Sequence, residues 1–399
     1  MRILMISDVY FPRINGVSTS IQTFRRGLHS LGHETVLIAP EYPAGAASPG
    51  DGEVIRIPSR YLPRDPEDRM MRSAEIRALT DALSRRAFDI VHVQTPFIAH
   101  YEGVRLARRL GVPVVETYHT YFEEYLYHYV PFVPRALMRL LARRFTTSQC
   151  NALDALVVPS RAMQTALEAY GVRCPMQIVP TGMEMERFAG GDGARFRAQL
   201  GIAPDRPTLV YVGRVAHEKN IDFLFRVLRK IVARRPDVVM ILAGEGPALP
   251  HCKAYVATLG LQEHVKFVGY LSRDSALLDC YKAGDLFIFA SKTETQGLVL
   301  LESMALGVPV VSTAHMGTAD IVTPQRGAHR APDDEQGFAD VVVELLADPQ
   351  QRAEMSAQAR AYAATWSASA MAAKLIDFYR HTIASVAVPV ETPDLDAVP

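Results

Sequence analysis

The sequence predicts an α/β protein of two domains, each built on a parallel β-sheet. Its 399 residues are too many for a single hydrophobic core. Short apolar runs bounded by turn residues alternate with segments of helical periodicity, an order typical of parallel sheets with right-handed crossovers. A segment rich in Gly, Asp and Pro at residues 192–207 marks the domain boundary. We therefore expect domains at residues 1–190 and 191–365, a C-terminal helix at 366–384 that packs back on the first domain, and a disordered tail at 385–399.

Composition and charge exclude several functional classes. Lys plus Arg and Asp plus Glu both number 43, so the overall charge gives no indication of nucleic-acid binding. The four cysteines are too far apart for a zinc site or a disulfide framework. The N-terminus reads as a β-strand ending at Asp8 rather than as a signal peptide, and no apolar run is long enough to span a membrane. We expect a cytoplasmic protein, with peripheral binding to the inner face of the membrane left open.

In the first domain, buried strands alternate with helices. The expected strands are Arg2–Ser7, Glu34–Pro40, Val54–Pro58, Phe88–Gln94, Val112–His119, Ala152–Ser160 and Met176–Gly182, and the clearest helices are Ser18–Leu31 and Ile76–Phe88. The turn after the first strand lacks the G-x-G-x-x-G fingerprint of dinucleotide binding. It places Gly16 at a helix entry instead, where the backbone can approach a phosphate or sugar closely. His119 ends its strand at the edge where ligands bind, and a structural role and a functional role are both open.

A basic amphipathic helix follows an aromatic-rich stretch of the first domain. Leu137, Met138, Leu140, Leu141 and Phe145 share it with Arg135, Arg139, Arg143 and Arg144. One interpretation is a surface helix whose arginines are solvated. The other is a patch, made by these four arginines, that docks on anionic lipid and so lies near a lipid acceptor.

The second domain begins with the strand Thr208–Arg214. Arg214 and Lys219 lie in the loop before the next helix, where two cations suit a diphosphate, although solvated surface cations are equally compatible with this position. Further expected strands are Val238–Pro247, Lys266–Leu271, Asp285–Ser291 and Pro309–Thr313.

The stretch Ser291–Pro309 has the strongest indication of a ligand site. A polar turn, Lys292–Gly297, leads from a buried strand into the helix Leu298–Leu306, whose first N–H groups are free to bind an anion. Glu294 and Glu302 flank this point. Carboxylates repel phosphate but bind hydroxyl groups well, so a sugar nucleotide explains both features. A helix-dipole acid beside an unrelated exposed Glu is the alternative.

Together, these motifs resemble those of the retaining glycosyltransferases of family 4, from residue 1 to about residue 379. The resemblance rests on the E-x7-E pair Glu294 and Glu302, and on Gly213–Asn220, Gly244–Pro247, Asn15–Val17, His119 and Pro180–Gly182. It implies the GT-B fold, in which two Rossmann-like domains with parallel sheets face each other across an interdomain cleft. Asn15 departs from the pattern, because many relatives carry a second glycine there.

The resemblance also implies roles for the matched residues. Arg214 and Lys219 would hold the donor diphosphate and stabilise the leaving group, Glu302 would bind the ribose, and Glu294 and His119 would contact the transferred sugar. Glu294, His119, Arg214 and Lys219 are therefore the catalytic candidates. The remaining donor-binding candidates, which would act through their backbone, are Gly16, Gly269, Tyr270, Leu271, Thr295, Gln296, Gly297 and Leu298.

The expected reaction moves a hexose from a nucleotide-diphosphate sugar, a UDP-sugar rather than GDP-mannose, to an acceptor hydroxyl with retention of the α configuration. Fixed cations and helix N–H groups would stabilise the departing diphosphate without a metal or another cofactor. Thr117–Pro131 resembles the corresponding stretch of glycolipid-forming members such as diacylglycerol α-glucosyltransferases, so we expect a membrane glycolipid precursor as acceptor. A soluble or polysaccharide acceptor is the alternative. Outside the family, an NAD-dependent oxidoreductase is disfavoured by the missing fingerprint, and an inactive sugar-nucleotide sensor by the retained polar residues.

Overall fold

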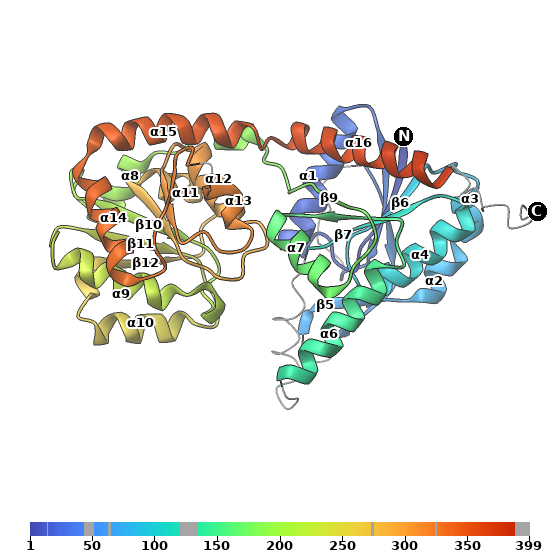
Figure 1. The fold of residues 1–399 in the computed structure, drawn as a ribbon, viewed down its shortest axis with the longest axis horizontal. Coiled ribbons are helices and arrows are strands. Elements are labelled where there is room, and N and C mark those ends of the chain that lie inside the picture. Colours follow the sequence, from blue (N-terminus) through green and yellow to red (C-terminus); the bar gives the residue numbers. More distant parts are fainter. Residues whose placement is uncertain are drawn as a thin grey trace, which may run out of the picture. The chain divides into compact units, whose positions relative to one another are not determined.

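The chain forms two compact units (Figure 1). A computed structural model describes residues 1–13, 15–43, 52–62, 65–119, 135–272, 275–323 and 325–387. Unit 1 comprises Met1–Pro159, Gln164–Val179 and Met371–Pro399, and unit 2 comprises Ser160–Met163 and Pro180–Ala370. The main division therefore falls after residue 179, whereas the sequence predicts it after residue 190.

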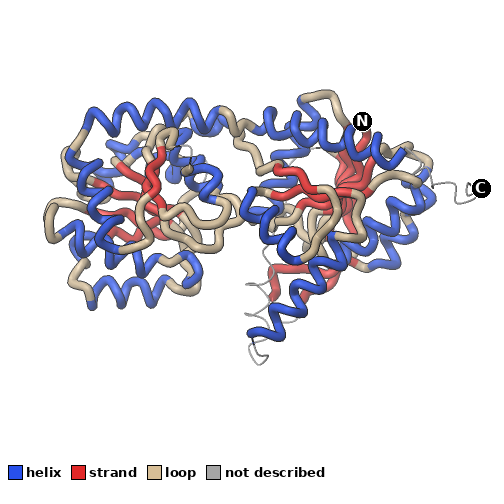
Figure 2. The backbone as a smooth tube through the Cα atoms, viewed as in Figure 1, coloured by secondary structure: helices blue, strands red, loops and turns tan. Residues whose placement is uncertain are grey.

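Unit 1 is built on a seven-stranded parallel sheet (Figure 2). Its strands are β1 (Arg2–Ile6), β2 (Glu34–Pro40), β3 (Glu53–Ile57), β6 (Ile90–Val93), β7 (Val114–Thr117), β8 (Ala155–Val158) and β9 (Met176–Ile178). They lie in the order β3-β2-β1-β6-β7-β8-β9, with Ile3 paired to Thr35 on one side and to Ile90 on the other. The strand order reverses between β1 and β6, and open parallel sheets bind ligands at such a switch point.

The helices of unit 1 flank this sheet. They are α1 (Gly16–Ser30), α2 (Ser73–Ala78), α3 (Thr80–Ser84), α4 (Ile98–Leu110), α6 (Arg135–Cys150), α7 (Arg161–Tyr170) and α16 (Ala368–Ala387). The helix expected over Ile76–Phe88 is divided into α2 and α3 at Leu79, although Ile76 and Leu83 are both buried. A hairpin of β4 (Ser59–Leu62) and β5 (Asp65–Met71) was not expected from the sequence.

Unit 2 has a second core on a six-stranded sheet, whose order matches that of unit 1 except for the last strand, β9. Its strands β10 (Thr208–Val212), β11 (Val239–Ala243), β12 (Val265–Gly269), β13 (Leu286–Phe289), β14 (Val310–Ser312) and β15 (Ala328–Arg330) are parallel, in the order β12-β11-β10-β13-β14-β15. Its helices are α8 (Gly193–Gln199), α9 (Ile221–Val232), α10 (Leu249–Thr258), α11 (Ala276–Lys282), α12 (Leu298–Ala305), α13 (Thr318–Val322), α14 (Glu335–Ala347) and α15 (Pro349–Ala364), with short 3-10 turns at Met185–Phe188, His217–Lys219 and Gln262–His264. The reversal lies between β10 and β13. The prediction of two parallel-sheet Rossmann-like domains is confirmed.

The C-terminal helix α16 belongs to unit 1 from Met371 onward. Tyr379 on α16 contacts His92 Nδ1 on β6 at 2.5 Å, and His92 Nε2 contacts Thr117 Oγ1 on β7 at 2.7 Å. Burial lowers the pKa of His92 to about 3, so the imidazole is neutral and joins helix to sheet by neutral hydrogen bonds. The helix continues to Ala387, past the expected start of the tail, and residues 388–399 lie outside the described residues. Within the part of the chain that the structure describes, no helix is long and apolar enough to cross a membrane.

Candidate functional site

The loops after β10 and β13 meet at the switch point of unit 2. Lys219 follows β10, Glu294 follows β13, and Lys219 Nζ lies 2.5 Å from Glu294 Oε1. Asn220 Nδ2 donates to the carbonyl of Ala290 at 3.1 Å, which joins the same two loops. The structure therefore brings together two side chains that are 75 residues apart in sequence.

The turn before α12 is held by hydrogen bonds from other loops. Gln296 Nε2 donates to Thr181 O at 2.8 Å, and Gln296 Oε1 accepts from Thr181 N at 2.9 Å. The N–H of Gly317 donates to Glu294 O at 2.8 Å. The side chain of Gln296 is thus used to fix the turn, which is compatible with its expected role through the backbone. Thr181 belongs to the Pro180–Gly182 motif. The sequence matched this motif to the family without showing what the motif does, and the structure shows that it holds the turn before α12.

Gly297 forms the left-handed N-cap of α12, with φ of 90°. A side chain there would be strained by the backbone, and its Cβ would also lie 2.8 Å from Thr318 Cγ2. No side chain among the described residues caps this helix. The first N–H groups of α12, including that of Leu298, therefore remain available for an anion at the switch point.

Glu302 lies one turn further along α12 and is only 9% exposed. Tyr281 Oη on α11 donates to Glu302 Oε2 at 2.8 Å. This bond fixes the carboxylate from the core side. A fixed carboxylate near an anion-binding helix end is suited to accept hydrogen bonds from a diol.

Arg214 has the most exposed side chain of the expected cations, at 64%. Its contact with Glu218 is long, 3.8 Å, so its guanidinium can turn to a ligand at little cost. The loop that carries it packs tightly against the loop after β11: a Cβ on Gly244 would lie 1.9 Å from Gly213 O. Backbone packing therefore requires the glycine at Gly244, whereas a Cβ on Gly213 would lie 3.1 Å from the side-chain atom Tyr211 Oη.

The expected base-binding residues lie at the end of β12. Gly269 has φ of 70°, and its carbonyl accepts from Gly244 N at 2.8 Å. Tyr270 is 65% exposed beside it. Leu271 is half-buried. Thr295, a donor-binding candidate in the turn before α12, is half-buried as well.

Unit 1 has its own polar cluster at its switch point, and sequence reasoning missed its central residue. Asp8, two residues after the end of β1, accepts from Thr95 Oγ1 at 2.8 Å and from Ala99 N in the first turn of α4 at 3.1 Å. Burial raises the pKa of Asp8 to about 7, although these hydrogen bonds partly oppose the shift. An acid at the carboxyl end of the first strand was the available signal, but Asp8 was interpreted only as the end of an apolar run.

His119 lies beside this cluster, at the end of β7. Its Nε2–H donates to Gln94 Oε1 at 3.1 Å, which leaves Nδ1 as the acceptor of the ring. Burial lowers the pKa of His119 to about 4, so the imidazole is neutral at physiological pH. His119 can therefore accept a hydroxyl hydrogen bond but does not supply a positive charge.

Gly16 is the first residue of α1, and Asn15 is its N-cap. Asn15 Oδ1 accepts from Ser18 N at 2.9 Å, and Ser18 Oγ accepts from Asn15 N at 2.9 Å. Asn15 has an extended backbone with φ of −151°, so it needs no glycine, which accounts for the departure from the family pattern. Among the described residues, nothing would lie within 4 Å of a Cβ on Gly16. These residues therefore do not require a glycine there, and they leave the space open to a ligand.

The expected membrane patch lies on α6. Arg143 and Arg144 are exposed, and Arg143 lies over the Tyr170 ring at 4.8 Å. Leu137, Leu140 and Leu141 are 47%, 53% and 52% exposed. The structure does not describe the side chains of Arg135 and Arg139. It also does not describe residues 120–131, which belong to the stretch that resembles diacylglycerol α-glucosyltransferases. Across the described ranges, no group of three or more His, Cys, Asp or Glu residues could hold a metal ion.

Two Rossmann-like units, each with polar residues at its switch point, are the architecture expected of a GT-B glycosyltransferase. Residues 192–362 match the group 1 glycosyl transferases, and residues 14–187 match glycosyltransferase family 4. The chain is 33% identical over 320 residues to an alpha-monoglucosyldiacylglycerol synthase of Streptococcus pneumoniae, covering 78% of this chain and 71% of that protein. The chain belongs to family 4 of the glycosyltransferases and transfers a sugar from a nucleotide-sugar donor to an acceptor.

Other similar proteins include a mannosyltransferase and two solved structures. A GDP-mannose-dependent alpha-mannosyltransferase of Mycobacterium tuberculosis is 28% identical, covering 92% of this chain and 93% of that protein. The crystal structure of Anabaena HepE with UDP superposes with a TM-score of 0.74 at 18% identity, covering 96% of this chain and all of that one. The structure of sucrose-phosphate synthase of Thermosynechococcus elongatus superposes with a TM-score of 0.75 at 21% identity, covering 96% of this chain and 99% of that one.

Proposed function

We propose that this protein transfers a hexosyl group from a UDP-sugar to a hydroxyl of a glycerolipid such as diacylglycerol, with retention of configuration and without a metal ion. The single observation that carries the chemistry is the Lys219–Glu294 pair in front of the free N-terminus of α12. It places a cation, a carboxylate and unpaired N–H groups at one switch point, as a nucleotide-diphosphate sugar requires.

Different residues of the donor site suit the diphosphate and the sugar parts of the donor. The N–H groups at the start of α12, Lys219 and Arg214 suit the diphosphate, because they are hydrogen-bond donors or cations. Glu302 suits the ribose diol. Glu294 suits a hydroxyl of the transferred sugar, and it also orients Lys219 in the absence of donor.

The mechanism follows from where charge develops. Cleavage of the glycosidic bond places negative charge on the departing diphosphate and positive character on the sugar carbon. Preorganised N–H groups and cations stabilise the first charge without reorganisation, in the role that a metal ion has elsewhere. The neutral His119 would orient the sugar through Nδ1. Retention would follow if the acceptor hydroxyl attacks from the face that the diphosphate leaves, with the diphosphate receiving its proton.

Two observations favour a glycerolipid acceptor. The relative that is 33% identical is an alpha-monoglucosyldiacylglycerol synthase, and a second protein of that name from Acholeplasma laidlawii is 28% identical over 321 residues. On α6, three half-exposed leucines lie beside Arg143 and Arg144. An apolar face with cations beside it is suited to an anionic membrane surface, where such an acceptor would be found.

The test is product formation from UDP-glucose, UDP-galactose and GDP-mannose, with diacylglycerol in mixed vesicles or without lipid, in buffer with EDTA. We expect one UDP-sugar to yield an α-linked glycolipid, and Glu294→Gln to abolish the product. Restoration by magnesium after loss in EDTA would contradict metal independence. A β-linked product would contradict retention.

The second candidate is transfer of mannose from GDP-mannose. The Mycobacterium tuberculosis mannosyltransferase favours it, because its match extends over more of this chain than the synthase match does. Product from GDP-mannose alone would replace the first proposal for the donor and leave the site chemistry unchanged. Equal turnover without lipid would direct the acceptor search to soluble compounds and polysaccharides.

A further inference from the structure

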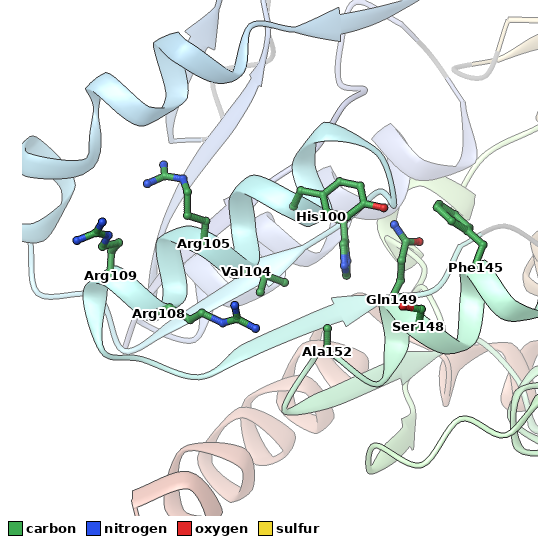
Figure 3. A pocket seen from close by; sticks show the side chains of 10 residues that line it. His100, Val104, Arg105, Arg108, Arg109, Phe145, Ser148, Gln149 and Ala152 are labelled. Carbon is green, nitrogen blue, oxygen red and sulfur yellow. The ribbon is translucent and has the colours of Figure 1, made fainter.

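A cavity of about 560 Å³ lies between α4 and α6 in unit 1 (Figure 3). The α4 wall carries Arg105, Arg108 and Arg109, and the α6 side carries Phe145, Ser148 and Gln149. Figure 3 shows Arg108 extending from α4 towards Ala152, which lies in the turn after α6. None of the described residues that line the cavity is a carboxylate. We infer that this cavity binds the phosphate headgroup of an anionic phospholipid.

The protein neutralises the charge of the α4 wall only in part. Glu102 is buried and pairs with Arg105 at 2.7 Å and with Arg77 at 2.9 Å. This one carboxylate therefore serves two arginines. Arg108 and Arg109 are exposed, and the structure gives neither of them an ion pair within the described residues. Two free guanidinium groups at one end of a cavity are complementary to a phosphate, which they can bind in bidentate fashion.

The opposite end of the cavity is apolar and exposed. Tyr101 lines it and is 58% exposed, and Phe97, one turn earlier, is 54% exposed. On α6, Phe145 lines the cavity and lies one turn after Leu141, which is 52% exposed. Exposed aromatic and aliphatic side chains that continue from a cationic cavity fit an amphiphile at a membrane surface better than a small soluble anion.

The residues that line this cavity differ from the exposed leucines of α6 that favour a lipid acceptor, although Leu141 lies one turn from Phe145. The lipid bound in the cavity is not consumed in the reaction. The inference therefore holds whether the acceptor is a lipid or a soluble compound. The inference also differs from general attraction between arginines and an anionic surface, because a defined cavity can be blocked without any change in charge.

The experiment measures sedimentation of the full chain with phosphatidylcholine vesicles, with or without phosphatidylglycerol, and without sugar donor. Arg108→Gln with Arg109→Gln removes the free cations. Ala152→Phe fills the cavity from an exposed position and keeps every charge. Arg173→Gln with Lys374→Gln is the matched control, because it removes two exposed cations of unit 1 outside the cavity. Thermal unfolding checks that each variant is folded, and Ser148→Phe replaces Ala152→Phe if that variant is not.

We expect the arginine pair and Ala152→Phe each to weaken binding to phosphatidylglycerol vesicles about tenfold or more, and the control pair by less than about threefold. The inference is overturned if Ala152→Phe binds as the unmodified chain does, because the attraction is then surface charge alone. It is also overturned if glycerol 3-phosphate, titrated without vesicles, binds as tightly as the vesicles do and loses binding in Ala152→Phe. The cavity would then serve a soluble phosphate compound. Neither result bears on the transfer reaction, which the product assay tests separately.

Discussion

Lys219 Nζ and Glu294 Oε1 are 2.5 Å apart, and this ion pair joins the loops that follow the two central strands of unit 2. The side chains are 18% and 22% exposed, so their attraction is less screened than that of a surface pair. Because the diphosphate would also attract Lys219, donor binding is expected to change this pair from an internal contact into a pair of ligand contacts.

Replacing Lys219 with Met tests this role. We expect kcat/KM to fall about a hundredfold or more, the loss typical when one preorganised charge-stabilising donor is removed. Steady-state kinetics with the best donor measures it. Arg229→Met is the control, since Arg229 is an exposed cation on α9 outside the site. An unchanged kcat/KM in Lys219→Met would remove the lysine from the mechanism.

Gln296→Ala tests how the turn before α12 is held. The buried Thr181 N–H and carbonyl would lose the partners that now lie at 2.9 and 2.8 Å, and we expect the free energy of unfolding to fall by about 1–3 kcal/mol. The donor KM should rise as well, because the α12 N-terminus is less fixed. Urea denaturation and donor saturation measure the two effects. Gln350→Ala, at an exposed glutamine bonded to Glu354, should leave both nearly unchanged.

The neutrality of His119 gives a prediction about pH. Because burial lowers its pKa to about 4, the ring gains a proton only near and below that pH, and the usual histidine transition near pH 6.5 should be absent. NMR titration of the ring proton resonance, assigned by its loss in His119→Gln, measures this directly. A midpoint near 6.5 would show that the ring is solvated and would contradict the Gln94-bound geometry.

Asp8 gives a stability prediction with a defined sign. Its pKa is about 7 in the folded state and 3.8 in the unfolded chain, so the folded state binds more protons between these values. Its contribution to stability is therefore fully present below pH 3.8 and decreases as the pH rises to about 7, with a slope of up to about 1.4 kcal/mol per pH unit.

Asp8→Asn removes this titration. Urea unfolding at a series of pH values should show the variant gaining stability relative to the unmodified chain between pH 4 and 7, with no further change above. Other groups titrate equally in both proteins and cancel in the difference. A difference that does not vary with pH would mean that Asp8 is ionised throughout this range.

Much of the fold could be predicted because its signals are local. The apolar strands from Arg2 to Phe289 and the helix after Gly297 follow from residue periodicity and turn residues. The hairpin of β4 and β5 and the division at Leu79 could not be predicted, since they depend on pairing and packing with distant segments.

The candidate site shows the same limit. Glu294, Glu302 and Lys219 were identifiable from motifs, but not the Lys219–Glu294 contact, the Tyr281 bond to Glu302 or the Gln296 bonds to Thr181. Each of these joins residues that are at least 21 positions apart. Asp8 was missed because its environment, and therefore its pKa, is set by Thr95 and α4.

The sequence by itself determined the class of protein, the two α/β units, and which charged residues lie at the ends of strands and helices. These properties follow from covalent order and local geometry. Only the tertiary structure decided the partners and protonation of those residues, such as the neutral His119 beside Gln94, and the arginine cavity between α4 and α6. Hydrogen bonding and desolvation depend on distances in space, and the folded chain sets those distances between residues that are remote in sequence.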